Sequence, residues 1–212
     1  MDDSIDGSDG LARRLKCGDR EALAELFSLH RKRLWRMIKF RIDQRLQGRV
    51  DPDDVLQEGY VAAAERLQHY GNDSPFSPFV WLRMVLLQTL IDVHRYHLGA
   101  QMRDAYREVD VRGCRYPQTT AASLAAVLVG SITSPSQAAT RAEILEQAEK
   151  AIAAMEPLDR EVLALRHFEE LRNSEVADVL GIKPKTASIR YIRALRRLKS
   201  ILSQTPGYSE GN

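Results

Sequence analysis

The sequence predicts an all-α protein made of two small helical domains joined by a flexible linker. Apolar residues recur at helical spacing, and no run of alternating β-branched residues bounded by turns is found. Proline and glycine are sparse, at 8 and 12 positions, so few sites interrupt the periodic segments. A length of 212 residues suits one domain or two small ones. A hydrophobic share of 44% and a charged share of 28% exclude collagen, coiled-coil rods and a wholly disordered chain.

The first predicted domain spans residues 11–100. After an initial amphipathic segment, a second helix is expected to begin behind Asp51, a natural N-cap, with Pro52 at its first position. Residues 71–78 form a loop by composition, because glycine, asparagine, serine and proline are concentrated there. A third helix is expected at 79–97.

The second predicted domain spans residues 141–203 and follows a linker at 101–140. Clusters of proline, serine and threonine leave only weak helical pieces in that linker. Within the second domain, Pro157 breaks the first helix, and Gly181 separates a short helix from the last one.

Charge is distributed unevenly along the second domain. Residues 181–202 carry seven basic side chains and no acidic one, whereas residues 143–178 carry ten acidic side chains and four basic ones. An acidic scaffold followed by a basic helix is typical of a nucleic-acid-binding face carried on one element. A solvated charged helix is the alternative interpretation.

The spacing of small residues near this basic stretch predicts a helix-turn-helix. Ala177 is followed four residues later by Gly181, and six residues after that by Ala187. Small residues let two helices approach closely, and glycine accepts the positive φ of the turn. The start of the second helix would then enter a major groove, where its side chains could contact bases and phosphates. The candidate DNA-binding residues are Lys185, Thr186, Ser188, Ile189, Arg190, Arg193, Arg196 and Arg197. An ordinary helical hairpin with a basic surface remains the alternative.

The first predicted domain carries two polar motifs on its helices. One lies at the start of the helix that Asp51 caps and comprises Asp53, Asp54, Gln57 and Glu58. The other lies on the next helix and comprises Trp81, Gln88, Thr89, Asp92 and Arg95. Taken alone, the first motif is typical of a solvated helix face, and a tryptophan at a helix start is more often a core residue.

Taken together, the motifs resemble the sigma factors of bacterial RNA polymerase, in the two-domain extracytoplasmic-function (ECF) group of the sigma-70 family. Residues 53–58 resemble the family's region 2.2, and residues 79–95 resemble regions 2.3 and 2.4. Residues 158–165 resemble the start of region 4, and residues 175–194 resemble region 4.2. Residues 94–104 are further similar to a planctomycete-type subgroup.

The resemblance implies a sigma factor that binds core RNA polymerase, directs it to specific promoters and helps to open the −10 element. The motif at 53–58 would contact the clamp of the largest polymerase subunit. The motif that includes Trp81 would contact the −10 element, and the loop at 71–78 would help to form a pocket for an unpaired base. The candidate DNA-binding residues of the last helix would hold the −35 element. The resemblance also implies the flap of the second polymerase subunit as a partner, and adds an anti-sigma factor as a further candidate.

Two other classes of protein stay open at this point. A free-standing helix-turn-helix regulator would bind duplex DNA without polymerase, but it leaves the motifs of the first domain unexplained. A partner-binding module would have no DNA role at all.

An enzyme is a poorer match to the sequence. His94 and His97 lie one helical turn apart, but no third metal ligand stands at a suitable spacing. The sequence also lacks a glycine-rich phosphate loop and a nucleophile motif. We therefore expect no catalytic residue, no metal site and no cofactor.

Neither a secretion signal nor a membrane segment is expected. The longest uncharged apolar stretch, Ala121 to Ile132, is shorter than the ~20 residues that span a bilayer. The acidic, polar start of the chain does not have the order of a signal peptide. Cys17 and Cys114 stand too far apart for a Cys-x-x-Cys pair. The sequence therefore predicts a cytoplasmic protein.

Overall fold

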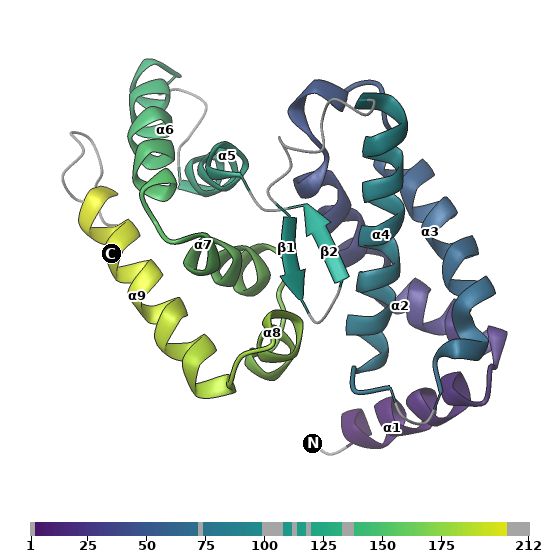
Figure 1. Cartoon of the computed structure of the whole chain (residues 1–212). Helices are drawn as coiled ribbons and strands as arrows, with labels where there is room; N and C mark the ends of the chain where they lie inside the picture. Colours follow the sequence, from purple (N-terminus) through teal and green to yellow (C-terminus); the bar gives the residue numbers. More distant parts are fainter. Residues whose placement is uncertain are drawn as a thin grey trace. The chain divides into compact units, whose positions relative to one another are not determined.

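The computed structural model divides the chain into two compact units, Met1–Pro117 and Gln118–Asn212 (Figure 1). Both units are built mainly from helices, so the predicted all-α, two-domain fold is confirmed. The functional boundaries placed at residues 100 and 141 stay a prediction. The structure describes residues 3–71, 74–98, 108–111, 114–117, 120–132 and 138–202.

The first unit is a helical bundle. Its helices are α1 (Asp3–Lys16), α2 (Arg20–Arg41), α3 (Pro52–Arg66) and α4 (Pro78–Leu98), with 3-10 turns at Gln44–Leu46 and Leu67–His69. Helices α2, α3 and α4 pack against one another, and α1 packs on α2. The fully buried side chains at their contacts include Leu23, Leu34, Ile38, Leu56, Leu82 and Leu86.

Two aspartates define where helices of the first unit begin. The Asp51 carboxylate accepts a hydrogen bond from the backbone N–H of Asp53 at 2.9 Å, and Pro52 occupies the first position of α3. Asp19 caps α2 in the same way, accepting from the N–H of Glu21 at 2.8 Å. The predicted N-cap at Asp51 is therefore confirmed, and it sets the start of the helix that carries the acidic motif.

Close contact between α3 and α4 depends on a residue without a side chain. A Cβ atom at Gly59 would lie 2.2 Å from Cδ2 and 3.1 Å from Cγ of Leu86, which is fully buried. Because the core leaves Leu86 little room, a larger residue at position 59 must push α3 away from α4.

We expect Gly59→Ala to lower the free energy of unfolding by up to about 2 kcal/mol. Overpacking costs about 1–3 kcal/mol, and the better helix propensity of alanine offsets about 1 kcal/mol of that. Urea unfolding of the full chain measures the change. Gly10→Ala is the matched control, because a Cβ at Gly10 in α1 meets nothing within 4 Å. Equal stability of Gly59→Ala and the parent would contradict the close packing.

The second unit is also helical. Its elements are α5 (Ala121–Ile132), α6 (Ala138–Ala153), α7 (Pro157–Leu163), a π-helical turn (Ala164–Phe168), α8 (Asn173–Leu180) and α9 (Pro184–Leu202). Helix α9 packs against α6, α7 and α8, while α5 packs on α6. The side chains buried between them include Ile152, Val162, Leu165, Val176 and Ala194.

The segment predicted as a linker, residues 101–140, contains more regular structure than its composition indicated. Strands β1 (Glu108–Val111) and β2 (Cys114–Pro117) pair antiparallel in one hairpin, and β2 lies against α4. Each strand has four residues, which is the shortest length over which alternating apolar and polar residues indicate a strand. Helix α5 was expected only as a weak helical piece, but it packs on α6, and its side chains Leu124 and Val129 are buried.

Within the described residues, no helix has the length and apolar character needed to cross a membrane.

Candidate nucleic-acid interface

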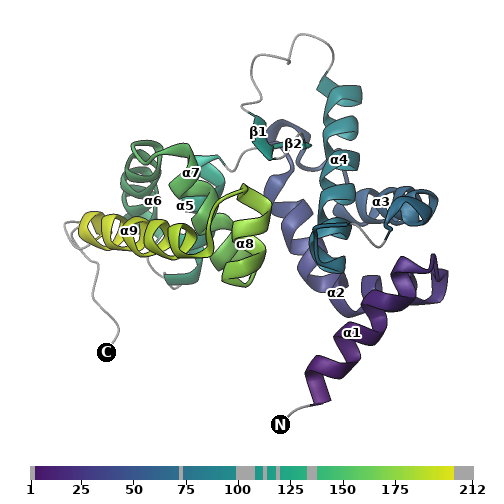
Figure 2. The ribbon, with the colours of Figure 1, turned by 60° about the horizontal axis from the view of Figure 1, so that its bottom comes forward.

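Helices α8 and α9 form the predicted helix-turn-helix (Figure 2). Gly181 ends α8 in the left-handed region, with φ 62° and ψ 28°. The backbone N–H of Ile182 donates to the carbonyl oxygen of Ala177 at 3.0 Å, which closes the turn. Ala177 and Ala187 are buried. The two alanines and Gly181 therefore form the close helix packing and the left-handed turn that their spacing predicted.

Side chains at the start of α8 hold the turn in place. The Glu175 carboxylate accepts from the backbone N–H of Arg172 at 2.7 Å, which satisfies a free donor at the helix start. The side-chain amide of Asn173 donates to the carbonyl oxygen of Pro184 at 2.8 Å. This bond ties the start of α8 to the start of α9, so it orients the helix that carries the basic residues.

We expect Gly181→Ala to lower the free energy of unfolding by about 1–2 kcal/mol, because the left-handed conformation places Cβ against the following carbonyl. Gly181→Asn should lose less, since asparagine enters this region more readily. Chemical unfolding of the two variants and the parent tests the order. If alanine were tolerated as well as asparagine, the left-handed turn at Gly181 would be wrong.

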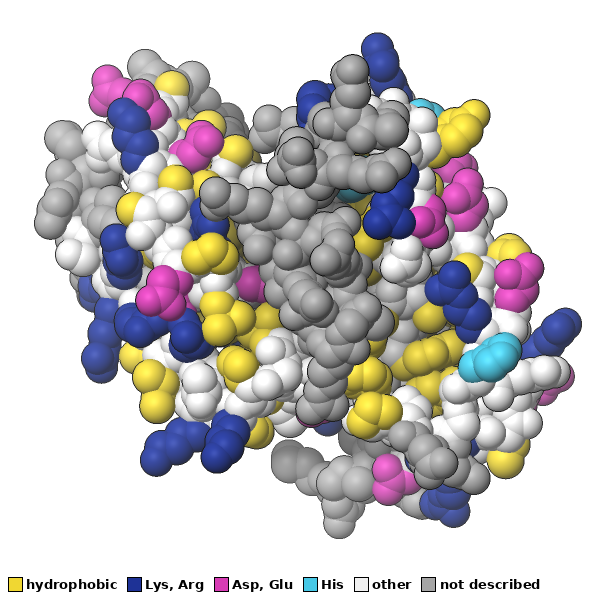
Figure 3. Space-filling view, in the orientation of Figure 1, with side chains coloured by type: hydrophobic (Ala, Val, Ile, Leu, Met, Phe, Trp, Pro, Cys, Tyr) yellow, Lys and Arg dark blue, Asp and Glu magenta, His cyan; other side chains and the backbone are white. Residues whose placement is uncertain are grey.

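The basic residues predicted for DNA binding lie along α9, where Lys and Arg side chains gather on the face seen in Figure 3. The exposed members of the predicted set are Lys185, Ile189, Arg193, Arg196 and Arg197. The partly buried members are Thr186, Ser188 and Arg190. Ile192, one turn after Ile189, is also an exposed large apolar residue. The prediction left out Ile192, although its i+3 spacing from Ile189 could have indicated it.

Two of the predicted base-reading arginines are bound to the start of α7. Arg190 Nη1 donates to Asp159 Oδ1 at 2.7 Å and to Glu156 Oε2 at 2.9 Å. Arg193 donates to Asp159 Oδ2 from Nη2 at 2.6 Å and from Nε at 2.9 Å. The hydrogen bond to Glu156, followed by the one to Asp159, raises the pKa of Arg190. We call these four residues the arginine–carboxylate cluster.

The arginine–carboxylate cluster changes the interpretation of both arginines. Arg190 was expected near the outward face of α9, but its side chain is only 24% exposed, whereas that of Arg193 is 53% exposed. Some N–H donors of each guanidinium are therefore occupied by carboxylates, and only the others can bind bases or phosphates. The sequence contains no local signal for this contact, because more than thirty positions separate the partners.

The polar residues predicted to contact the −10 element form a row along α4. Gln88 donates to Asp92 at 3.3 Å, and Arg95 lies 3.5 Å from the same carboxylate oxygen. Asp92 and Arg95 are exposed. The Thr89 hydroxyl instead donates to the carbonyl oxygen of Val85 at 3.2 Å, so it is engaged by its own helix.

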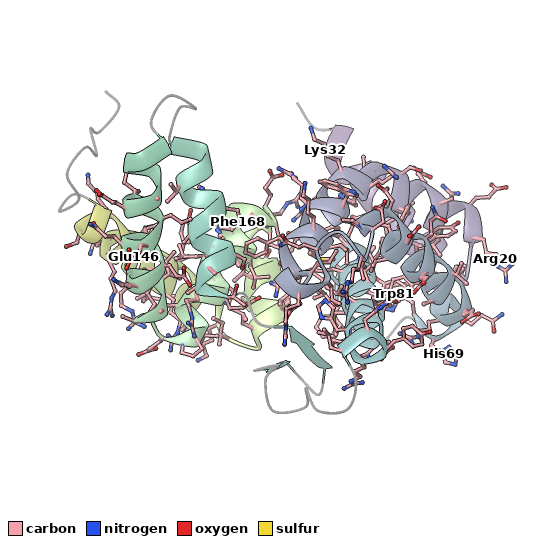
Figure 4. All side chains as sticks on the ribbon, turned by 90° about the horizontal axis from the view of Figure 1, so that it is seen from above. Arg20, Lys32, His69, Trp81, Glu146 and Phe168 are labelled. Atoms are coloured by element: carbon pink, nitrogen blue, oxygen red, sulfur yellow. The ribbon has the colours of Figure 1, made fainter. Side chains whose placement is uncertain are left out.

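Trp81 lies near the start of α4 and is partly exposed (Figure 4). Its ring lies on that of Tyr70, with the centroids 4.7 Å apart and the planes inclined by 36°. Tyr70 is buried, and its hydroxyl donates to the carbonyl oxygen of Phe76 at 3.1 Å. Burial raises the pKa of Tyr70 to about 12. Tyr70 was not predicted. It supports Trp81 from one side and the loop that precedes α4 from the other.

Parts of the predicted sites lie outside the described residues. These are residues 72–73 of the loop expected to form the base pocket, and residues 99–104 of the planctomycete-like stretch. The pocket and the subgroup both stay predictions.

The residues of the acidic motif on α3, at positions 53–58, lie in two different environments. Asp54, Gln57 and Glu58 are exposed, and so is the apolar Val61 on the same helix. Asp53 differs, because its carboxylate is bound to the Arg31 guanidinium and accepts from Trp35 Nε1 at 3.1 Å. Asp53 therefore ties the start of α3 to α2.

The histidines of α4 have different environments. His94 is buried, and its Nε2 accepts from the backbone N–H of Asp43 at 3.3 Å. Burial lowers the pKa of His94 to about 4. His97 is exposed. Among the described residues, no group of three or more His, Cys, Asp or Glu side chains is placed to hold a metal ion.

Comparison with known proteins shows what the chain is similar to. Residues 145–198, which include α8 and most of α9, match the family model described as "Sigma-70, region 4". The chain is 23% identical over 205 residues to the RNA polymerase sigma factor NccH of Alcaligenes xylosoxydans xylosoxydans, covering 96% of this chain and 98% of that protein. It is 27% identical over 198 residues to the RNA polymerase sigma factor CnrH of Cupriavidus metallidurans, covering 91% and 92%.

Over nearly its whole length the chain is therefore similar to RNA polymerase sigma factors, and its second unit contains a match to sigma-70 region 4. A solved structure of CnrH in complex with the cytosolic domain of CnrY matches this chain with a TM-score of 0.51 at 21% identity, covering 93% of this chain and 97% of that one. This likeness supports the two-domain helical fold.

Proposed function

We propose that this chain is a sigma factor that directs RNA polymerase to specific promoters: it binds the core enzyme through the exposed acidic face of α3, holds the −35 element as duplex through α9, and helps to open the −10 element beside α4. The observation that carries the proposal is the helix-turn-helix of α8 and α9 with basic side chains along α9. Two DNA contacts on one chain raise the effective concentration of the second, so two modest sites make a selective reader.

The polymerase-binding surface of the proposal consists of Asp54, Gln57 and Glu58 around the exposed Val61. An apolar residue surrounded by charged and amide groups is a usual composition for a protein interface, with the charges setting orientation and association rate. The clamp of the largest polymerase subunit is the partner that we assign to this surface. Asp53 contributes indirectly, because it positions the start of α3 on α2.

At the −10 element, the proposal requires a protein surface that captures an unpaired base. Extruding a base costs a few kcal/mol, and stacking on an aromatic side chain returns about 1–3 kcal/mol per base. Trp81, supported by Tyr70, supplies a partly exposed ring near the start of α4. The row of Gln88, Asp92 and Arg95 offers donors and acceptors along the same helix.

Further partners follow from the same proposal. Helix α9 would contact the flap of the second polymerase subunit. Because CnrH is described in complex with the cytosolic domain of CnrY, we include an anti-sigma factor among the partners of this chain. The site of action would be the bacterial cytoplasm. No catalytic step is assigned to this chain, since the polymerase performs the chemistry.

Transcription with purified components tests the proposal. Bacterial core polymerase alone is compared with core polymerase plus this chain on a pool of promoter fragments with a fixed downstream run-off end. The proposal expects discrete transcripts that appear only with the chain and share upstream sequence elements. The same transcripts with and without the chain would overturn it.

A further inference from the structure

The arginine–carboxylate cluster is built from two helix segments that face each other in the second unit. Asp159 lies in the first turn of α7, where the helix dipole favours a carboxylate. Arg190 and Arg193 lie three residues apart on α9, so they project from the same side of that helix. Helices α7 and α9 pack against each other, which brings the groups within hydrogen-bond distance.

Asp159 is the centre of the cluster. Its side chain is 8% exposed, and each of its two oxygens accepts from a different arginine. Glu156 completes the cluster at the surface, with a side chain that is 62% exposed. Charge-assisted hydrogen bonds of this kind are stronger than neutral ones, and partial burial reduces their screening by salt. Two positive and two negative groups thus neutralise each other beside the DNA-binding helix.

The other basic residues of α9 differ in this respect. Within the part of the chain that the structure describes, Lys185, Arg196 and Arg197 form no ion pair. Their charge is fully available to phosphates. A guanidinium has five donors in a fixed plane, so donors that face Asp159 do not bind a phosphate or a guanine at the same time. The two carboxylates therefore compete with DNA for Arg190 and Arg193.

We propose that Glu156 and Asp159 are positioning residues of promoter recognition: they hold Arg190 and Arg193 toward α7 and thereby limit the sequence-independent attraction of α9 for phosphates. The inference rests on the proposed role of α9 at the −35 element. With fewer free charges on α9, less of the binding free energy comes from contacts that any DNA can make. The side chains that contact bases then contribute a larger share, so discrimination between the promoter and other DNA increases.

The test measures DNA binding by holoenzyme assembled from core polymerase and the full chain. One duplex carries the upstream element that the parent holoenzyme selects from a randomised pool, and the other carries that element scrambled. Asp159→Asn removes the central negative charge at nearly constant volume. We expect it to bind the scrambled duplex more tightly and to steepen the slope of log K against log salt by about 1–2, since each neutralised phosphate contributes about 0.9. The ratio of the two affinities should fall by about tenfold, within the range that one base-reading contact contributes.

Two further variants keep the outcome interpretable. Glu156→Gln removes the exposed carboxylate and should change the same quantities in the same direction, but less. Glu146→Gln is the matched control, because it makes the same charge change on α6, where Glu146 is paired with Lys150. Urea unfolding of each variant shows whether the second unit is still folded. If the second unit of Asp159→Asn is unfolded, the result for Glu156→Gln decides the test.

The failure of this inference differs from the failure of the proposed function. If the parent with core polymerase selects no sequence, the proposed function is wrong. If the parent discriminates but the cluster variants match Glu146→Gln in slope and ratio, only the inference is overturned. Equal weakening on both duplexes at an unchanged salt slope also overturns it, since that result describes a purely structural role.

Discussion

Glu58→Lys is expected to weaken the binding of this chain to core RNA polymerase by at least about tenfold, because a like charge placed in an interface costs several kcal/mol. Glu58 lies on the exposed face of α3, and among the described residues its carboxylate makes no hydrogen bond or ion pair. The substitution therefore removes a contact with the partner and leaves the fold of the first unit intact. Titration of labelled core polymerase with the variant measures the change.

The control for this prediction is Glu146→Lys on α6 (Figure 4), which reverses a charge in the second unit. It should bind core polymerase as the parent does. If Glu58→Lys and Glu146→Lys were to bind equally well, the acidic face of α3 would not be the polymerase-binding surface. Loss of cooperative unfolding in Glu58→Lys would likewise contradict a role limited to the partner.

Trp81→Ala is expected to reduce open-complex formation by about fivefold to more than a hundredfold, while closed-complex binding at the −35 element changes little. The range follows from the about 1–3 kcal/mol that stacking on an aromatic ring contributes per base, with 1.4 kcal/mol for each factor of ten. Permanganate reactivity of unpaired thymines reports opening, and binding of a duplex truncated downstream of the −35 element reports the closed contact.

A structural role for Trp81 must be separated from base capture, because its ring packs on Tyr70. Trp81→Phe keeps an aromatic face and should retain most of the opening activity, whereas Trp81→Leu keeps apolar packing but not stacking and should resemble alanine. If leucine supports opening as well as phenylalanine does, Trp81 acts as a core residue and the proposed base pocket is wrong.

The parts of the fold that the sequence predicted are those that local chemistry determines. Asp51 and Pro52 mark a helix start because an N-cap and a first-turn proline act within one turn. Ala177, Gly181 and Ala187 mark a helix-turn-helix because sterics at a tight turn allow few alternatives. Helix α5 was underestimated, because its packing on α6 is a tertiary contact that composition does not reveal.

The candidate site was predictable in its outline but not in its internal contacts. The basic face of α9 follows from composition, whereas the hydrogen bonds of Arg190 and Arg193 to Asp159 depend on how α7 and α9 pack. Asp53 looked equivalent to its neighbours in the motif, yet only the fold brings Arg31 and Trp35 to it. Side chains that are distant in sequence meet through tertiary structure, which no spacing rule encodes.

The central claim is that this chain recognises promoters as a subunit of RNA polymerase, and one comparison tests it most directly. Specific binding of promoter duplex is measured for the full chain alone, for core polymerase alone and for the two together. The account predicts stoichiometric assembly of the chain with core polymerase, and sequence-specific binding only for the assembled pair. Specific duplex binding by the chain alone, without assembly at micromolar concentrations, would contradict the account and leave a free-standing helix-turn-helix regulator.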